Sequence, residues 1–147
     1  MNKIIAFLSV APLFCGLSTM NAEAAELCVG IKDADMRAFC IAQRSKRADS
    51  CDLITDSTWR TFCQSSSTRD PAECFKIGDE PLTNYCFALQ QRTSLACFDI
   101  EDPNLEFLCY SHIQNTQRFC PDVKDSKLND LCMGLYDPSL KAPRPTL

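Results

Sequence analysis

The sequence has little of what enzyme sites are usually built from. It holds one histidine, His112, and no Cys-x-x-Cys pair, so neither a zinc site, a histidine-based nucleophile nor thiol–disulfide catalysis is indicated. Glycine is scarce, with 4 in the chain, and no glycine-rich phosphate loop is found. We therefore expect no catalytic residue, no metal ion and no cofactor. We interpret His112 as a residue of a helix surface or groove.

Charge and hydropathy argue against two classes of partner. The formal net charge is −4, whereas nucleic-acid-binding domains usually present a strongly basic face. The longest apolar run, residues 4–14, is far shorter than the ~20 residues that span a bilayer. We expect neither nucleic acid as a partner nor a membrane span.

Residues 1–24 have the three parts of a secretory signal peptide. A short start with Lys3 precedes the apolar run, and a small-x-small site ends at Ala24. Cleavage there removes Cys15 and leaves ten of the 11 cysteines. An even number of cysteines in an exported chain indicates a disulfide framework. We predict a protein of a bacterial periplasm or, alternatively, a secreted one.

These ten cysteines divide the chain into five repeats of 23 residues. The steps between them alternate between 12 and 11 residues without an insertion, and a fixed period of this kind is typical of repeat architectures. We place the repeat region at 25–136 and a proline-rich, extended tail at 137–147. The repeats begin at 28–50 and continue at 51–73, 74–96, 97–119 and 120–142. The cysteines are Cys28, Cys40, Cys51, Cys63, Cys74, Cys86, Cys97, Cys109, Cys120 and Cys132.

The sixth position of every repeat is an aspartate that begins a helix. Aspartate is a favoured N-cap, and in the fourth repeat it precedes Pro103, which is favoured at the first helical position. Apolar residues follow three, six and seven places later, which is the spacing of one helical face. We predict a helix of ~12 residues in each repeat, for example over 34–46 and 103–115. The predicted caps are Asp33, Asp56, Asp79, Asp102 and Asp125.

A second, shorter helix precedes each capped helix and holds the first cysteine of the repeat. The pair Asp70 and Pro71 is a start signal for it, whereas Pro121 weakens it in the last repeat. Each repeat is thus predicted to be an αα-hairpin, and the fold is an all-α, disulfide-braced solenoid of five hairpins. The hairpins resemble those of tetratricopeptide repeat proteins in architecture only, because the 23-residue period is shorter.

Two disulfide schemes are open, one within repeats and one across their boundaries. Both close small loops, so spacing alone does not decide between them. Pairing within repeats uses all ten cysteines, whereas pairing across boundaries leaves Cys28 and Cys132 at opposite ends. We predict the scheme within repeats.

The regular acidic residues have both a functional and a structural interpretation. The five aspartates could bind calcium, and the pairs Glu101/Asp102 and Asp79/Glu80 could act as catalytic carboxylates. Calcium, however, needs about six to eight oxygens on one ion, and the series supplies one aspartate per hairpin. Carboxylates at a helix start also favour the helix dipole. We interpret these residues as helix caps and dipole partners.

Aromatic residues adjoin the cysteines of the third and fourth repeats: Phe75, Phe87, Phe98 and Tyr110. If exposed, they form a patch of the kind enriched at protein interfaces; the alternative is that they pack between hairpins. Solenoids present long binding surfaces. We therefore predict a non-enzymatic module of the bacterial envelope that binds another protein, such as a periplasmic inhibitor or an immunity protein against a toxin or lytic enzyme. The alternative is a secreted effector that acts on a host or competitor cell.

Overall fold

One α-helix per repeat begins directly after the capping aspartate. The computed structural model describes residues 26–136, and the predicted signal peptide and proline-rich tail lie outside this range. Helices α2 and α5 end one residue before the predicted ends, because Lys46 and Asn115 take the left-handed conformation as C-caps. The helices are α2 (Ala34–Ser45), α3 (Ser57–Ser67), α4 (Glu80–Gln91), α5 (Pro103–Gln114) and α6 (Ser126–Leu135).

The shorter element, predicted as the first α-helix of an αα-hairpin, is instead a 3-10 helix in the second to fifth repeats. In every repeat the amide of the fourth residue donates to the carbonyl of the first cysteine, as from Ile54 to Cys51 over 3.1 Å. A segment this short gains few i→i+4 bonds, so the tighter i→i+3 pattern is used. The element that contains Pro121 is the shortest. The 3-10 helices are η1 (Ala48–Leu53), η2 (Pro71–Lys76), η3 (Ser94–Asp99) and η4 (Cys120–Asp122).

The predicted disulfide scheme is confirmed, because each of the five bridges lies within one repeat. Their Cα–Cα distances run from 5.6 to 6.0 Å, within the usual range for cystines. All ten residues are fully buried. Each bridge ties the start of a repeat to its α-helix. The pairs are Cys28–Cys40, Cys51–Cys63, Cys74–Cys86, Cys97–Cys109 and Cys120–Cys132.

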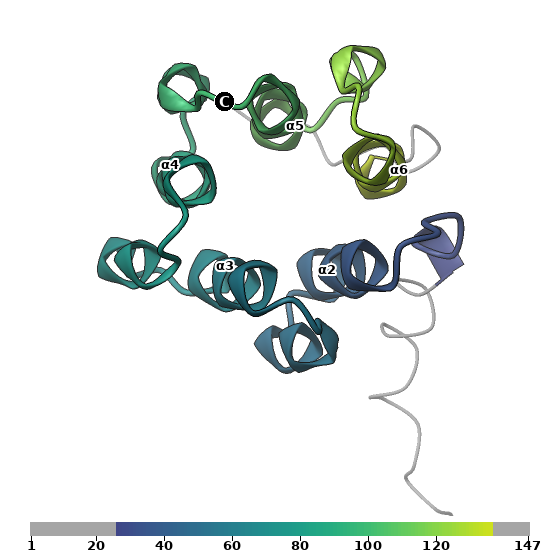
Figure 1. Ribbon diagram of the computed structural model, residues 1–147, viewed down its shortest axis with the longest axis horizontal. Helices are drawn as coiled ribbons and strands as arrows, with labels where there is room; N and C mark the ends of the chain where they lie inside the picture. Colours follow the sequence, from purple (N-terminus) through teal and green to yellow (C-terminus); the bar gives the residue numbers. More distant parts are fainter. Residues whose placement is uncertain (1–25, 137–147) are drawn as a thin grey trace, which may run out of the picture.

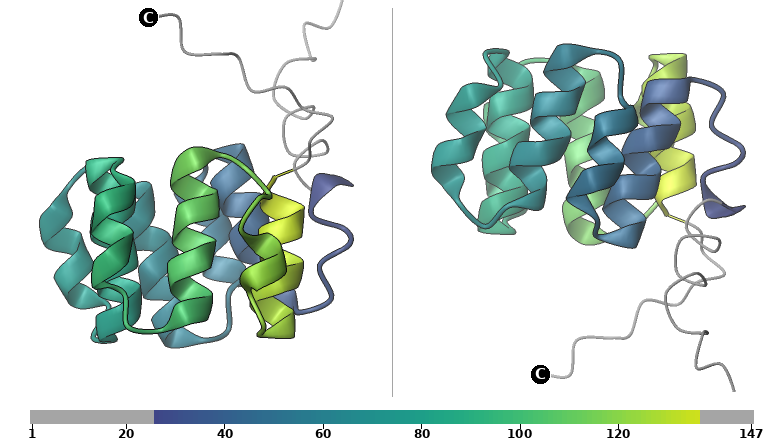
Figure 2. Two further views of the ribbon diagram at one scale, coloured as in Figure 1. Left: turned by 90° about the horizontal axis from the view of Figure 1, so that it is seen from above. Right: turned by 90° about the horizontal axis from the view of Figure 1, so that it is seen from below.

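The five hairpins close into a ring (Figure 1). Helix α2 packs against α6 as closely as successive α-helices pack against each other. The α-helices form the inner wall, and the 3-10 helices lie on the outside. The side views show the α-helices standing next to one another around the ring (Figure 2). The predicted all-α array of disulfide-braced repeats is therefore confirmed, and its closure is a feature that the repeat pattern did not predict.

The last and first repeats meet at a seam through the same pair of repeat positions that joins the fourth and fifth repeats. In the fourth repeat the eighth residue, Asn104, accepts a hydrogen bond from the amide of Asp125, the sixth residue of the next repeat, over 2.9 Å. At the seam the eighth residue is Lys127, and its ammonium lies 3.0 Å from the carboxylate of Asp33, the sixth residue of the first repeat. The same positional relation thus continues from repeat five to repeat one.

A second contact repeats at the seam in the same way. The side-chain amide of Gln90, the seventeenth residue of its repeat, donates to the carbonyl of Ser65 over 3.1 Å. At the seam the seventeenth residue is Arg44, and its guanidinium donates to the carbonyl of Gly134 over 3.4 Å. A Cβ at Gly134 would lie 2.7 Å from Ile31. A side chain at this position would force the Ile31 side chain to shift, so glycine permits the close approach of the first and last repeats.

Large side chains from the twelfth position of each repeat fill the interior of the ring. All five are fully buried. Three of them form a stack, with ring centroids 5.3 Å apart between Phe39 and Phe62 and 5.0 Å apart between Phe62 and Tyr85. Such contacts stabilise the core beyond the burial of apolar area. The five residues are Phe39, Phe62, Tyr85, Leu108 and Leu131.

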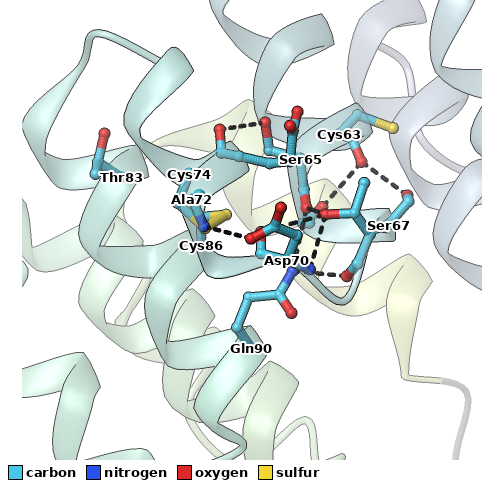
Figure 3. Close-up of a disulfide and its surroundings, with 12 residues drawn as sticks. Cys63, Ser65, Ser67, Asp70, Ala72, Cys74, Thr83, Cys86 and Gln90 are labelled. Carbon is cyan, nitrogen blue, oxygen red and sulfur yellow. Dashed lines mark hydrogen bonds between the residues drawn. A yellow bond between two sulfur atoms is a disulfide. The ribbon is translucent and has the colours of Figure 1, made fainter.

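Polar contacts hold successive repeats together next to the disulfides, as the surroundings of Cys74–Cys86 show (Figure 3). The side chain of Asp70 caps η2 by accepting from the amide of Ala72 over 2.9 Å. The amide group of Gln90 also donates to the carbonyl of Thr68 over 2.7 Å. The joint between the second and third repeats is thus fixed by main-chain acceptors at the end of α3.

Candidate functional site

One end of the ring is acidic, since the N-termini of all five α-helices meet there. A depression of about 380 Å³ at this end is lined by all five capping aspartates and by Asp35, with Lys127 as the single basic residue of its lining. Its floor is apolar and includes Trp59 and Leu105. We call this surface the acidic end. The α-helices are therefore parallel, and their dipoles point the same way.

Five of the six aspartates of the acidic end cap the α-helices, while Asp35 accepts from the amides of Thr55 and Asp56. Asp102, for example, accepts from the amides of Asn104 and Leu105 over 2.9 Å each. At Asp33, the amide of Met36 and the ammonium of Lys127 lower the pKa of the carboxyl below its usual 3.8. Bonds to the ionised form stabilise it. The carboxylates thus already have donors in the folded chain.

The carboxylates that could have formed a calcium or catalytic site are spread around the acidic end. In residues 26–136 no three His, Cys, Asp or Glu side chains come close enough together to hold a metal ion. Asp79 and Asp102 accept from amides of α4 and α5, while Glu80 and Glu101 beside them are exposed. Asp79 and Asp102 thus have the geometry of helix caps.

The aromatic residues singled out in the sequence lie on the outside of the ring. Phe75 in η2 and Phe98 in η3 are 74% and 70% exposed. Phe87 and Tyr110 are half-buried against the core. The ring centroids of Phe75 and Phe87 are 5.1 Å apart, and those of Phe98 and Tyr110 are 5.6 Å apart. Each exposed phenylalanine is thus held in place by an aromatic ring beneath it.

Two further residues extend this surface. Leu95, which is exposed, lines a shallow groove of about 420 Å³ together with Phe87. It precedes Phe98 by three residues in a 3-10 helix, so the two side chains lie on one face. Phe119 lies 5.5 Å from Tyr110 between ring centroids. We define the aromatic belt as these residues: Phe75, Phe87, Leu95, Phe98, Tyr110 and Phe119.

His112 lies in a pocket of about 290 Å³ near the C-terminal ends of the α-helices. Its Nδ1 is 2.8 Å from the hydroxyl of Tyr85, and its ring is 5.9 Å from that of Tyr136. Burial lowers the pKa of His112 to about 4, because desolvation disfavours the charged imidazolium. His112 is therefore neutral at neutral pH, and the structure places it in a pocket, in agreement with the expected groove position.

A set of cations that was not predicted as a site lies at this same end of the ring. Lys46, Arg69 and Arg92 occupy the nineteenth position of the first three repeats and line one cleft. The signal was present in the repeat register, since the same position is basic three times in succession.

No family model, no curated protein and no solved structure matches the chain. Within residues 26–136, no helix combines the length and apolar character that crossing a membrane requires. The five disulfides fit a protein that folds in an extracellular or other oxidising compartment. The function must therefore be argued from the residues of this chain.

Proposed function

We propose that this protein is a non-enzymatic, exported module that binds another protein through the aromatic belt. The observation that carries the proposal is the exposure of Phe75 and Phe98, each about three-quarters open to solvent and each supported by a second aromatic ring. Aromatic side chains, phenylalanine among them, are enriched at the cores of protein interfaces. Contiguous exposed apolar surfaces that are large mark interaction sites of soluble proteins.

The scaffold supports this role, because it holds the belt rigidly. Each 3-10 helix that carries an exposed phenylalanine is tied to an α-helix by a disulfide, Cys74–Cys86 for Phe75 and Cys97–Cys109 for Phe98. A preorganised surface loses little conformational entropy on binding. The ten cysteines of the repeats are all paired, so none of them offers a free thiol for catalysis.

A periplasmic inhibitor or an immunity protein against a toxin or lytic enzyme is the form of this function that we favour. A small, rigid, disulfide-braced surface suits the capture of one folded partner. A secreted effector that acts on a host or competitor cell would use the same surface. The two differ in the compartment where the protein and its partner are found.

The test is a capture experiment with the oxidised protein as bait and with envelope and culture-medium fractions as separate sources. The belt variant is F75A/F98A, and the matched control is V29A/L53A, which truncates two other exposed apolar side chains. We expect one partner to be retained by the wild type and the control and lost by the belt variant. Recovery from the envelope supports an inhibitor or immunity protein. Equal retention by the belt variant and the wild type would refute the role of the belt.

A further inference from the structure

A cleft of about 680 Å³ opens at the end of the ring where α2, α3 and α4 finish. It lies opposite the acidic end, because the first residues of the same helices are there. Lys46, Arg69 and Arg92 line it, and no carboxylate of residues 26–136 does. We call it the basic cleft.

The cations of this cleft have no partner within the described part of the chain. Arg69, Arg92 and Lys46 make no side-chain hydrogen bond or ion pair there, and they are exposed. Every other arginine of residues 26–136 is engaged by a carbonyl, a carboxylate or an aromatic ring. These engaged residues are Arg37, Arg44, Arg47, Arg60 and Arg118. The unengaged guanidinium groups are thus gathered at one place.

Two of the three cations sit on strained backbone. Lys46 and Arg92 are C-caps with φ of 53°, a left-handed conformation that glycine or asparagine adopts more readily than other residues. The fourth repeat has Asn115 at the same position with φ of 49°, and Asn115 does not line the cleft. Long cations thus stand at the two left-handed positions that line the cleft, and asparagine stands at the one that does not.

The helix dipoles do not cancel this positive charge. Each C-terminus carries a partial charge of about −0.5, so three helix ends contribute about −1.5 against three full positive charges. The dipole makes a base favourable at each helix end. It does not account for three bases around one cleft without a neighbouring acid. The cleft keeps a net positive field that a bound anion can neutralise.

The remaining polar groups of the cleft are already engaged with the protein. The hydroxyls of Ser66, Ser67 and Thr68 donate to carbonyls of α3 over 3.0, 2.7 and 2.8 Å. The amide group of Gln90 donates to carbonyls at the end of α3, as Figure 3 shows. The donors left for a ligand are thus the guanidinium groups and the ammonium, which match phosphate oxygens in charge and geometry.

We propose that the basic cleft binds a phosphate-bearing ligand with at least two negative charges, either a free phosphate compound or the phosphate headgroups of a lipid surface. A polyanion that enters the cleft meets this local positive field, although the chain as a whole carries a net charge of −4. The cleft shares Leu89 and Arg92 with the pocket of His112 and Ile113.

The experiment measures binding of inorganic tripolyphosphate to the oxidised protein by isothermal titration calorimetry. The test variant is R69Q/R92Q, and the matched control is K32Q/K124Q, which removes the same charge outside the cleft. We expect R69Q/R92Q to weaken binding by more than about tenfold, since each guanidinium bond to an anion is charge-assisted. The control should stay within about twofold, because only screened long-range charge changes.

Sedimentation with phosphatidylglycerol vesicles, against phosphatidylcholine vesicles, distinguishes the two sources of phosphate. Binding to tripolyphosphate alone assigns a free phosphate compound, and binding to phosphatidylglycerol vesicles that R69Q/R92Q abolishes assigns a lipid headgroup. The proposal is overturned if the wild type binds neither probe. It is also overturned if the control loses as much affinity as R69Q/R92Q, since the interaction would then depend on overall charge alone.

Discussion

At the acidic end of the ring the carboxylates accept hydrogen bonds from the first turns of the helices, whereas at the opposite end the cations of the basic cleft have no partner in residues 26–136. Parallel helix dipoles favour acids at one end and bases at the other. The two ends therefore obey the same electrostatic rule but differ in what the charges do. The aspartates stabilise the helix starts, whereas the cations of the basic cleft are the groups that we propose bind a ligand.

The largest expected effect on stability comes from removing one of the disulfides that brace the repeats between the two ends. The pair C74A/C86A deletes a disulfide that closes a loop of sequence separation 12 between η2 and α4. We expect the free energy of unfolding to fall by about 3 kcal/mol, because the unfolded chain gains freedom. Urea unfolding followed by helical circular dichroism measures it. An unchanged midpoint would mean that the ring does not depend on its disulfides.

The two ends of the ring should lose stability in different pH windows. His112 has a pKa of about 4 when folded and about 6.5 when unfolded, so the unfolded chain binds the proton more tightly. The contribution of neutral His112 to the free energy of unfolding is therefore fully present above pH ~6.5 and is lost as pH falls toward ~4. The loss is at most about 3 kcal/mol, and it is smaller because solvent screens the partly exposed ring.

The acidic end responds in a lower window. The pKa of Asp33 lies below 3.8 when folded, because the amide of Met36 bonds the ionised form. Its stabilisation is present above pH ~3.9 and is lost only as pH falls through the folded value. We expect H112Q to flatten the stability curve between pH ~4 and ~6.5 and to leave the lower window unchanged. A curve with the same slope as the wild type in the upper window would contradict this assignment.

A smaller effect is expected from D102A at the acidic end. The substitution removes the acceptor of two amides of α5, so stability should fall by about 1 kcal/mol. D102N, which keeps a capping oxygen, is the control and should lose a few tenths of a kcal/mol at most. Thermal unfolding measures both. If calcium stabilises the wild type but not D102A, the acidic end binds a ligand and the comparison between the two ends fails.

The smallest effect, and one of opposite sign, is expected from R92G at the basic cleft. Glycine relieves the left-handed strain at φ of 53°, and its greater freedom in the unfolded chain offsets part of the gain. We expect stability to rise by about 0.5 kcal/mol in the same thermal assay. N115G, which replaces an already favourable residue, should change little. A clear loss of stability in R92G would show that Arg92 has a partner in the folded protein.

Much of the fold could be predicted because its signals are local. The cap at Asp102 and the apolar residues after it lie within one helix, and the disulfide partners lie within one repeat. The exposure of Phe75 was left open, since a residue beside a cysteine can point inward or outward and only the packed hairpin decides. The basic cleft was missed although Lys46 and Arg92 hold the same repeat position, because the repeat register does not tell whether these side chains line one cleft.

The repeat and the helix starts were set by the sequence alone, because capping and helical periodicity act over a few residues. The disulfide scheme was predicted because only pairing within repeats uses all ten cysteines. The ring, its two charged ends and the surfaces on them were decided by the tertiary structure. Closure depends on how small rotations add up over five hairpins. It depends as well on close packing at the seam, where Gly134 meets Ile31 and Lys127 meets Asp33. Such contacts join the first and last repeats, which no local pattern connects.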